Sequence, residues 1–134
     1  MKRIVKIWIE QEWLYGQGDD GKTYRQSLLW YKGLMNASPE QREQYEFSLS
    51  GIHWPCLDVD VSFESFLYDD AEPKQSQRFF LTHPEINIAG FARKYGLNPT
   101  LLRNYVNGFK TPSDSRDAYI MECVRKMGKE FSSL

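Results

Sequence analysis

The stretch from Glu85 to Ser113 constrains the fold of this 134-residue chain more than any other. Apolar residues recur there at steps of three and four, which places them on one face of a helix. The spacing predicts two short helices joined by a tight turn. The apolar faces consist of Ile88, Phe91, Ala92 and Tyr95 in the first helix and Leu101, Leu102, Tyr105 and Val106 in the second.

The residues around these two runs are typical of helix ends. Asn87 and Asn98 stand where an amide side chain can cap a helix start, and Pro99 occupies the first helical position, where its missing N–H costs nothing. Gly96 and Gly108 follow the two runs, and glycine readily takes the left-handed conformation of a helix exit. The boundaries of both helices are therefore predicted from local chemistry alone.

Two helices meeting at a glycine-containing turn are the arrangement of a helix-turn-helix. The stretch resembles the lambda-repressor-like family of bacterial helix-turn-helix proteins, and this resemblance implies a second helix that enters the major groove of DNA. Any helical hairpin with core-facing apolar residues is the alternative. The residues that carry the resemblance are Phe91-Ala92, Gly96-Leu97, Leu102, Tyr105, Gly108 and Lys110-Thr111-Pro112-Ser113.

Polar residues on the second predicted helix are the candidates for DNA contact. Thr100, Arg103 and Asn104 occupy exposed positions in the prediction, and arginine suits guanine as asparagine suits adenine. Asn107 and Lys110, at and beyond the helix end, are predicted to contact phosphates. These five residues are the predicted DNA-binding site.

Charge is distributed unevenly along the chain. Residues 1–72 hold seven Lys and Arg against 13 Asp and Glu, a net of −6, whereas residues 73–134 hold ten against five, a net of +5. The polar segment 69–77 lies between the two and contains Pro73. The sequence therefore predicts two domains, 1–72 and 73–134, and the basic one has nucleic acid as its natural partner.

The N-terminal part combines strand and helix patterns. Residues 3–9 alternate and predict a strand, a second strand begins at Trp13, and a third spans 23–28, which together make a small antiparallel meander. A short helix follows within 28–35. Ser38 and Pro39 are a strong helix start, and the helix that begins there is expected to carry Arg42, Tyr45, Glu46 and Phe47.

Residues 51–62, GIHWPCLDVDVS, resemble a widespread bacterial domain of unknown function, family 2442. Ala37, Ser38, Glu40 and Arg42 match the pattern that usually lies upstream, and the resemblance covers about residues 3–68. It implies an α+β domain that some relatives carry fused to a helix-turn-helix. Some relatives look like antitoxins that bind small toxins, and the resemblance implies no established chemistry.

The same segment places His53, Cys56, Asp58 and Asp60 within eight residues. Zinc accepts such ligands, but their spacing matches no common zinc pattern, and a Cys–His hydrolytic pair would lack an orienting third group. The alternative is a purely structural role, in which Trp54-Pro55 form a buried turn and the aspartates cap a helix starting near Ser62. We therefore expect no metal site and no cofactor, and we expect that the protein is not an enzyme.

The C-terminal part is predicted to be entirely helical. A first helix spans 75–82, and a long closing helix spans 113–131. One side of the closing helix is traced by Ala118, Met121, Val124, Arg125 and Gly128. Tyr119, Ile120, Cys123 and Met127 widen its apolar face, and this excess could form a dimer contact or pack on the N-terminal part.

These patterns combine into an α+β protein with a small sheet-plus-helix domain followed by an all-α helix-turn-helix domain. We expect a bacterial transcriptional regulator that binds double-stranded DNA as a homodimer. The alternative is an antitoxin-like module whose acidic N-terminal domain binds a partner protein. No run approaches the roughly 18 apolar residues of a membrane helix, and Lys6 and Glu10 interrupt any signal-peptide core. Cys56 and Cys123 lie far apart in the sequence, which suits a reducing compartment. We therefore expect a cytoplasmic protein without a membrane partner.

Overall fold

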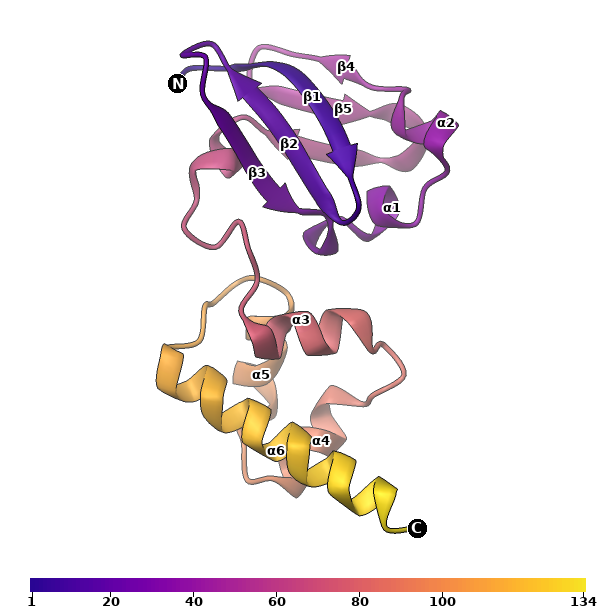
Figure 1. Ribbon diagram of the computed structural model, residues 1–134, viewed down its shortest axis with the longest axis vertical. Helices are drawn as coiled ribbons and strands as arrows, with labels where there is room; N and C mark the ends of the chain where they lie inside the picture. The colour runs from indigo at the N-terminus through magenta and orange to yellow at the C-terminus, as the bar shows by residue number, and fades with distance from the viewer. The chain divides into compact units, whose positions relative to one another are not determined.

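A computed structural model describes residues 1–134, which divide into two compact units, Met1–Glu72 and Pro73–Leu134. The first unit holds antiparallel strands with short helical segments between them, and the second holds helices only (Figure 1). The predicted α+β class and the helical C-terminal part are both confirmed at this level. Each unit encloses a hydrophobic core of its own.

The first sheet is the predicted meander. Its strands β1 (Ile4–Glu10), β2 (Trp13–Gly18) and β3 (Thr23–Ser27) are antiparallel neighbours in the order β1-β2-β3. Gly16 lies on the inner face of β2, where an added Cβ would stand 3.0 Å from the ring of Phe66 and 3.1 Å from the Ile4 side chain. Glycine there allows a close approach between the sheet and the rest of the core.

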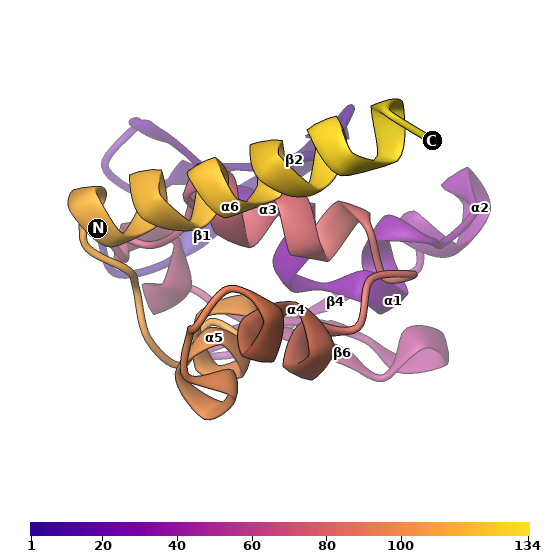
Figure 2. The same ribbon diagram turned by 90° about the horizontal axis from the view of Figure 1, so that it is seen from below.

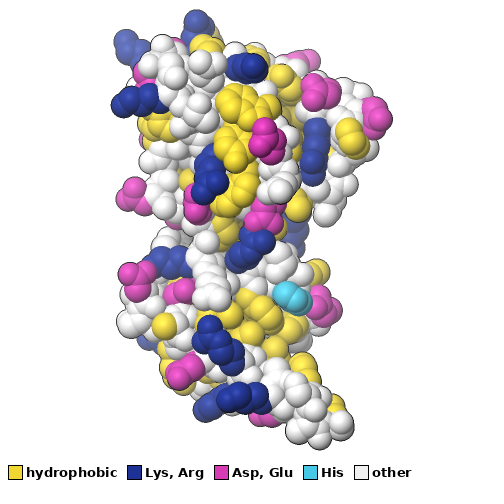
Figure 3. All heavy atoms as spheres, viewed as in Figure 1, with side chains coloured by type: hydrophobic (Ala, Val, Ile, Leu, Met, Phe, Trp, Pro, Cys, Tyr) yellow, Lys and Arg dark blue, Asp and Glu magenta, His cyan; other side chains and the backbone are white.

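The outer face of this sheet carries aromatic side chains that are covered by each other and by cations. Trp8 and Tyr15 are cross-strand partners with parallel rings 5.5 Å apart. Arg25 lies 4.2 Å from the Trp13 ring and pairs with Glu72 at 2.7 Å. Figure 3 shows hydrophobic side chains between charged ones on the near face of the unit.

The helix predicted to begin at Ser38 is much shorter than expected. Its capping box is present, but α2 (Pro39–Arg42) ends after one turn, and Glu46–Phe47 form strand β4 instead. Tyr45 packs its ring 5.7 Å from the ring of Trp54. Strand pairing and aromatic burial here outweigh the local helix signal. The preceding short segments are η1 (Leu28–Trp30) and α1 (Lys32–Met35).

A second sheet, absent from the prediction, occupies residues 46–62. Its strands β4, β5 (Gly51–Trp54) and β6 (Val59–Ser62) are antiparallel in the order β4-β5-β6. The short turn η2 (Pro55–Leu57) joins β5 to β6. Trp54 is fully buried as predicted, and its indole N–H donates to the Arg42 carbonyl at 2.9 Å.

The aspartates of this segment do not cap the following turn, which corrects the prediction. Asp60 lies on β6 and faces His53 of β5, with their side chains 2.6 Å apart. Asp58 takes a left-handed conformation with φ of 51°. The turn η3 (Glu64–Leu67) begins after Phe63, and the hydroxyl of the preceding Ser62 accepts from the Ser65 N–H at 3.1 Å. The two sheets enclose one core that consists of Ile4, Ile7, Leu14, Leu28, Leu34, Ile52, Trp54, Val61, Phe63 and Phe66.

The second unit consists of α3 (Gln75–Thr82), α4 (Ile88–Lys94), α5 (Pro99–Val106) and α6 (Asp114–Ser132). Within this unit, α6 lies on one side and the pair α4 and α5 on the other (Figure 2). The buried members of the core are Phe80, Phe91, Ala92, Leu97, Leu102, Tyr105, Val106, Ile120 and Cys123. No helix in either unit has the length and apolar character needed to cross a membrane.

The buried side of α6 differs in part from the predicted one. Ile120, Met121 and Cys123 are buried, whereas Ala118, Arg125 and Gly128 are exposed. The Asp117 carboxylate accepts from the backbone N–H of Ser76 at 2.8 Å and also from its hydroxyl. This polar attachment to α3 fixes the rotation of α6 about its axis, which periodicity alone left open.

The packing of α5 gives the first prediction. Leu102 is 2% exposed within the helical core, so Leu102→Ala should lower the free energy of unfolding by about 2 to 5 kcal/mol, as large-to-small core substitutions do. Urea denaturation of the full chain, followed by circular dichroism, measures the loss. Leu101→Ala, on a partly exposed neighbour, is the matched control and should cost less. Equal losses would contradict the placement of Leu102.

Candidate nucleic-acid interface

The turn between α4 and α5 is built by the residues that the sequence singled out. The Asn87 side chain accepts from the Gly90 N–H at 2.8 Å, and the Asn98 side chain accepts from the Leu101 N–H at 3.0 Å. Gly96 has φ of +70°, in the region that glycine occupies at low cost. The Leu97 N–H donates back to the Ala92 carbonyl at 2.8 Å. The Asn87 bond begins α4, and the bonds of Leu97 and Asn98 end α4 and begin α5 with four residues between the two helices.

Burial decides which face of α5 remains open. Leu102, Tyr105 and Val106 lie in the core. Thr100, Arg103 and Asn107 are exposed and Asn104 is partly exposed, and their spacing of three and four places them on one side of the helix. Four of the five predicted site residues thus share the solvent-facing surface of α5.

The polar side chains on this surface make no hydrogen bond and no ion pair within the protein. Arg103 takes part in none of the ion pairs, and its side chain makes no hydrogen bond. By contrast, Lys94 pairs with Glu130 and Lys74 pairs with Asp114 at 2.8 Å. The hydrogen bond that Lys94 donates to Glu130 raises the pKa of Lys94, and the hydrogen bond from the Lys74 ammonium lowers the pKa of Asp114. Arg103 is therefore free to bind an external acceptor without breaking an internal pair.

Lys110, the fifth predicted residue, lies beyond the end of α5 on a segment that folds back onto the helix. The N–H groups of Phe109 and Lys110 both donate to the Asn104 carbonyl, at 2.9 and 3.2 Å. Gly108 has φ of +79°, which allows the chain to reverse. The backbone of Lys110 is thereby held close to the C-terminal end of α5, and its side chain is exposed.

Sequence reasoning missed Gln77, which organises this end of α5 from inside the protein. The Gln77 side chain is 1% exposed. Its amide N–H group donates to the carbonyls of Tyr105 and Lys110 at 2.9 and 3.4 Å, and its amide oxygen accepts from the Lys74 N–H at 2.8 Å. A glutamine in a short amphipathic helix gives no sign of such a role, because its partners lie 28 and 33 residues away.

Sequence reasoning also missed Arg116, in the first turn of α6. Its side chain borders a small hollow together with Asn98 and Leu101, at the beginning of α5. Arg116 is exposed and pairs with no acid. Exposed cations therefore lie at both ends of α5, Arg116 near its start and Lys110 after its end.

The residues weighed as metal ligands are not gathered into a site. His53 and Asp60 form a surface pair, whereas Cys56 is exposed in the turn between their strands. No group of three His, Cys, Asp or Glu side chains is arranged to hold a metal ion. The His53–Asp60 pair is sufficiently explained by cross-strand pairing, which stabilises adjacent strands.

The comparisons with known proteins concern the N-terminal unit. Residues 8–72 match the family described as "Protein of unknown function (DUF2442)". This finding supports the resemblance inferred for residues 3–68 and carries no assigned chemistry. The resemblance of residues 85–113 to the lambda-repressor-like family stays a prediction. No curated protein and no solved structure matches the chain.

The role of Gln77 can be tested by removing its amide. Gln77→Met keeps the length of the side chain but leaves the Lys74 N–H without this acceptor and removes one of the donors to the Tyr105 carbonyl, which should cost about 1 to 3 kcal/mol of stability. Amide hydrogen exchange should also speed up at Phe109 and Lys110. Gln75→Met is the control, because Gln75 is exposed on the same helix. Unchanged exchange in Gln77→Met would contradict the role given to Gln77.

Proposed function

We propose that residues 73–134 bind duplex DNA as a helix-turn-helix, with α5 entering the major groove, and that the protein is a transcriptional regulator. One observation carries the proposal: α5 buries one face and presents Thr100, Arg103 and Asn104 on the other, with the Arg103 guanidinium unpaired. Arginine donating to guanine and asparagine pairing with adenine are the commonest ways in which side chains read bases.

The charges around α5 support the same proposal. Lys110 and Arg116 lie near opposite ends of the helix, where they can reach phosphates on either side of a groove. The unit as a whole carries a net charge of +5, against −6 for residues 1–72. Electrostatic attraction to the phosphate backbone supplies most non-specific affinity, so the second unit is the one expected to face DNA.

We propose that the protein binds DNA as a homodimer on a two-fold symmetric site. One α5 offers few base contacts, each worth about 1 to 3 kcal/mol, which falls short of the roughly 4 to 10 kcal/mol that separates specific from non-specific binding. Two copies double the contacts, with half-sites about 34 Å apart. Exposed apolar residues on α6, Tyr119 and Phe131, at 46% and 60% exposed, are available for the contact between copies.

The alternative function is recognition of a partner protein by the acidic unit, residues 1–72, as in an antitoxin. It is compatible with DNA binding, since it uses the other unit of the chain. Exposed Val5 and Phe47 beside open strand edges favour it. Neither function requires catalysis.

Two substitutions on the same surface should affect DNA binding differently. Arg103→Ala should relax the preference for one base at each symmetric position of the selected site, at a cost of about 1 to 3 kcal/mol. Lys110→Ala should weaken binding to every sequence and reduce the slope of log affinity against log salt by about one unit. The site is first selected from a random duplex pool, and fluorescence anisotropy over a salt series then measures both variants.

Arg125→Ala is the matched control, because it removes the same charge from α6, on the other side of the unit from α5 (Figure 2). It should leave base preference unchanged and alter the salt dependence less than Lys110→Ala. If the wild-type chain binds no duplex at low salt, the regulator proposal fails. Equal effects of Arg125→Ala and Arg103→Ala would refute the assignment of α5 as the reading helix.

A further inference from the structure

Each three-stranded sheet of the N-terminal unit has two edge strands, β1 and β3 in the first sheet and β4 and β6 in the second. β1 is the first strand of one sheet and β4 the first strand of the other, so each has a hydrogen-bonded neighbour on one side only. The other side of such a strand presents unpaired N–H and C=O groups, which can pair with an added strand. β1 is the longest of the four, with seven residues against five in β3, two in β4 and four in β6.

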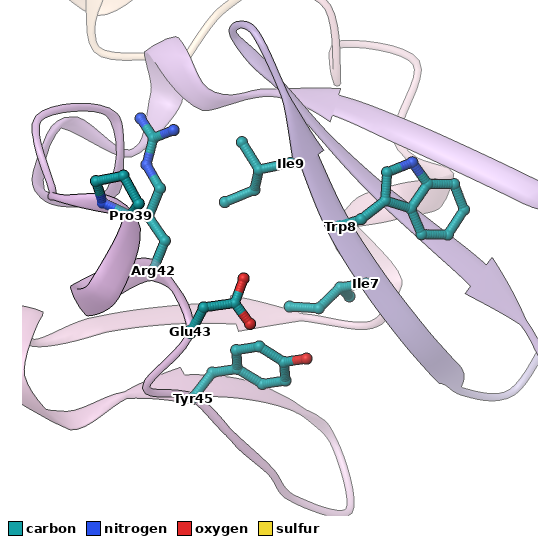
Figure 4. Close-up of a pocket in the computed structure, with 7 residues that line it drawn as sticks. All are labelled: Ile7, Trp8, Ile9, Pro39, Arg42, Glu43 and Tyr45. Atoms are coloured by element: carbon teal, nitrogen blue, oxygen red, sulfur yellow. The ribbon is translucent and has the colours of Figure 1, made fainter.

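Two hollows follow one another along β1 and face its open edge. The first, of about 250 Å³, lies between Ile7 to Ile9 and a wall made by Pro39, Arg42, Glu43 and Tyr45 (Figure 4). The second, of about 220 Å³, lies between Arg3 to Val5 and a wall made by Phe47, Ser48 and Phe63. Together the two hollows lie along residues 3–9, and seven residues of extended strand span about 23 Å.

Most of the side chains that line these hollows are apolar, and the charged ones are Glu43, Arg42 and Arg3. Val5 is 47% exposed and Phe47 45% exposed, which is high for large apolar side chains of a folded unit. Ile7 and Ile9 point toward the wall, whereas Trp8 turns away from it (Figure 4). The Glu43 carboxylate projects toward Ile7 and Tyr45, is exposed, and makes no ion pair.

The neighbouring arginine does not neutralise that carboxylate. Arg42 directs its guanidinium to backbone carbonyls, donating to Leu34 at 3.1 Å and to Met35 at 2.7 Å. Glu43 is therefore available for a cation brought by a ligand. The surrounding unit has a net charge of −6, which attracts a basic ligand from a distance.

We propose that the edge of β1 binds an extended segment of a partner protein as an additional antiparallel or parallel strand, in which apolar side chains alternate with lysine or arginine. Backbone groups of β1 would give affinity, while the hollows select alternate side chains, as in other cases of strand addition. The apolar side chains enter the hollows beside Val5 and Phe47, and a cation reaches Glu43. The inference rests on the partner-binding alternative and is independent of DNA binding.

A separate segment fits this edge better than a second copy of the chain. β1 of another copy is already covered along one side by its own β2 and carries its own wall from α2 to β4. If two copies paired through β1, their two walls would collide at the place where an added strand has to lie beside β1. A second copy would also bring another acidic unit of charge −6 against the first. A short basic strand without a sheet of its own meets neither obstacle.

The probe is a synthetic peptide of about nine residues, alternating valine and lysine, added to the full-length protein labelled for NMR. We expect the largest amide shifts in residues 3–9 and 43–48, together with cross-strand contacts between the peptide backbone and β1. Glu43→Lys should weaken binding about tenfold, because it exchanges an attraction for a repulsion. Val5→Lys should abolish the contacts to the second hollow.

Glu64→Lys is the matched control, because it makes the same charge change on an exposed residue that lines neither hollow. It should weaken binding less than twofold. Equal weakening by Glu43→Lys and Glu64→Lys would contradict binding at the two hollows, because the net charge of the protein alone would then determine the affinity. Shifts confined to another surface, or no binding of the peptide, would also overturn the proposal. If the free protein self-associates through β1 and Val5→Lys abolishes this association, the edge of β1 binds a second copy of the chain, and the proposal of a partner segment is wrong.

Discussion

The burial of one face of α5 is the constraint on which the second unit depends. Leu102, Tyr105 and Val106 fill a core that also holds Phe80, Phe91 and Ile120. A helix of eight residues can bury only one side, so the same packing dictates which residues face outward. The candidate site is therefore a consequence of the core. A change in the rotation of α5 would hide Arg103 and expose Leu102 together.

Buried polar contacts determine how the pieces of each unit are aligned. Gln77 joins α3 to the end of α5, Asp117 joins α6 to α3, and Trp54 joins β5 to the end of α2. An apolar core favours contact between two elements but allows them to shift along each other at little cost in free energy. A buried hydrogen-bond donor that loses its acceptor, by contrast, lowers the stability of the fold. These bonds therefore select one alignment from several that would bury similar apolar area.

The first unit shows how local signals and long-range pairing compete. Ser38, Pro39 and Gln41 form the expected capping box, yet the helix ends at Arg42 because β4 pairs with β5 and Tyr45 packs beside Trp54. The second sheet escaped prediction for the same reason. Strands of two to four residues show almost no alternation, and their stability comes from neighbours rather than from their own sequence. The open edge of β4, and the wall that Phe47 contributes to the second hollow beside β1, exist only because this second sheet forms.

The sequence by itself determined the features that rest on local chemistry. Capping by Asn87 and Asn98, the glycine turns, the first meander and the helices of the second unit could all be predicted, because each depends on residues within one or two turns of each other. The exposed face of α5 also followed from periodicity. Only the tertiary structure decided the second sheet, the rotation of α6, and the positions of Gln77 and Arg116 relative to α5. Those features depend on contacts between residues far apart in the chain, whose formation is governed by the packing of the whole unit.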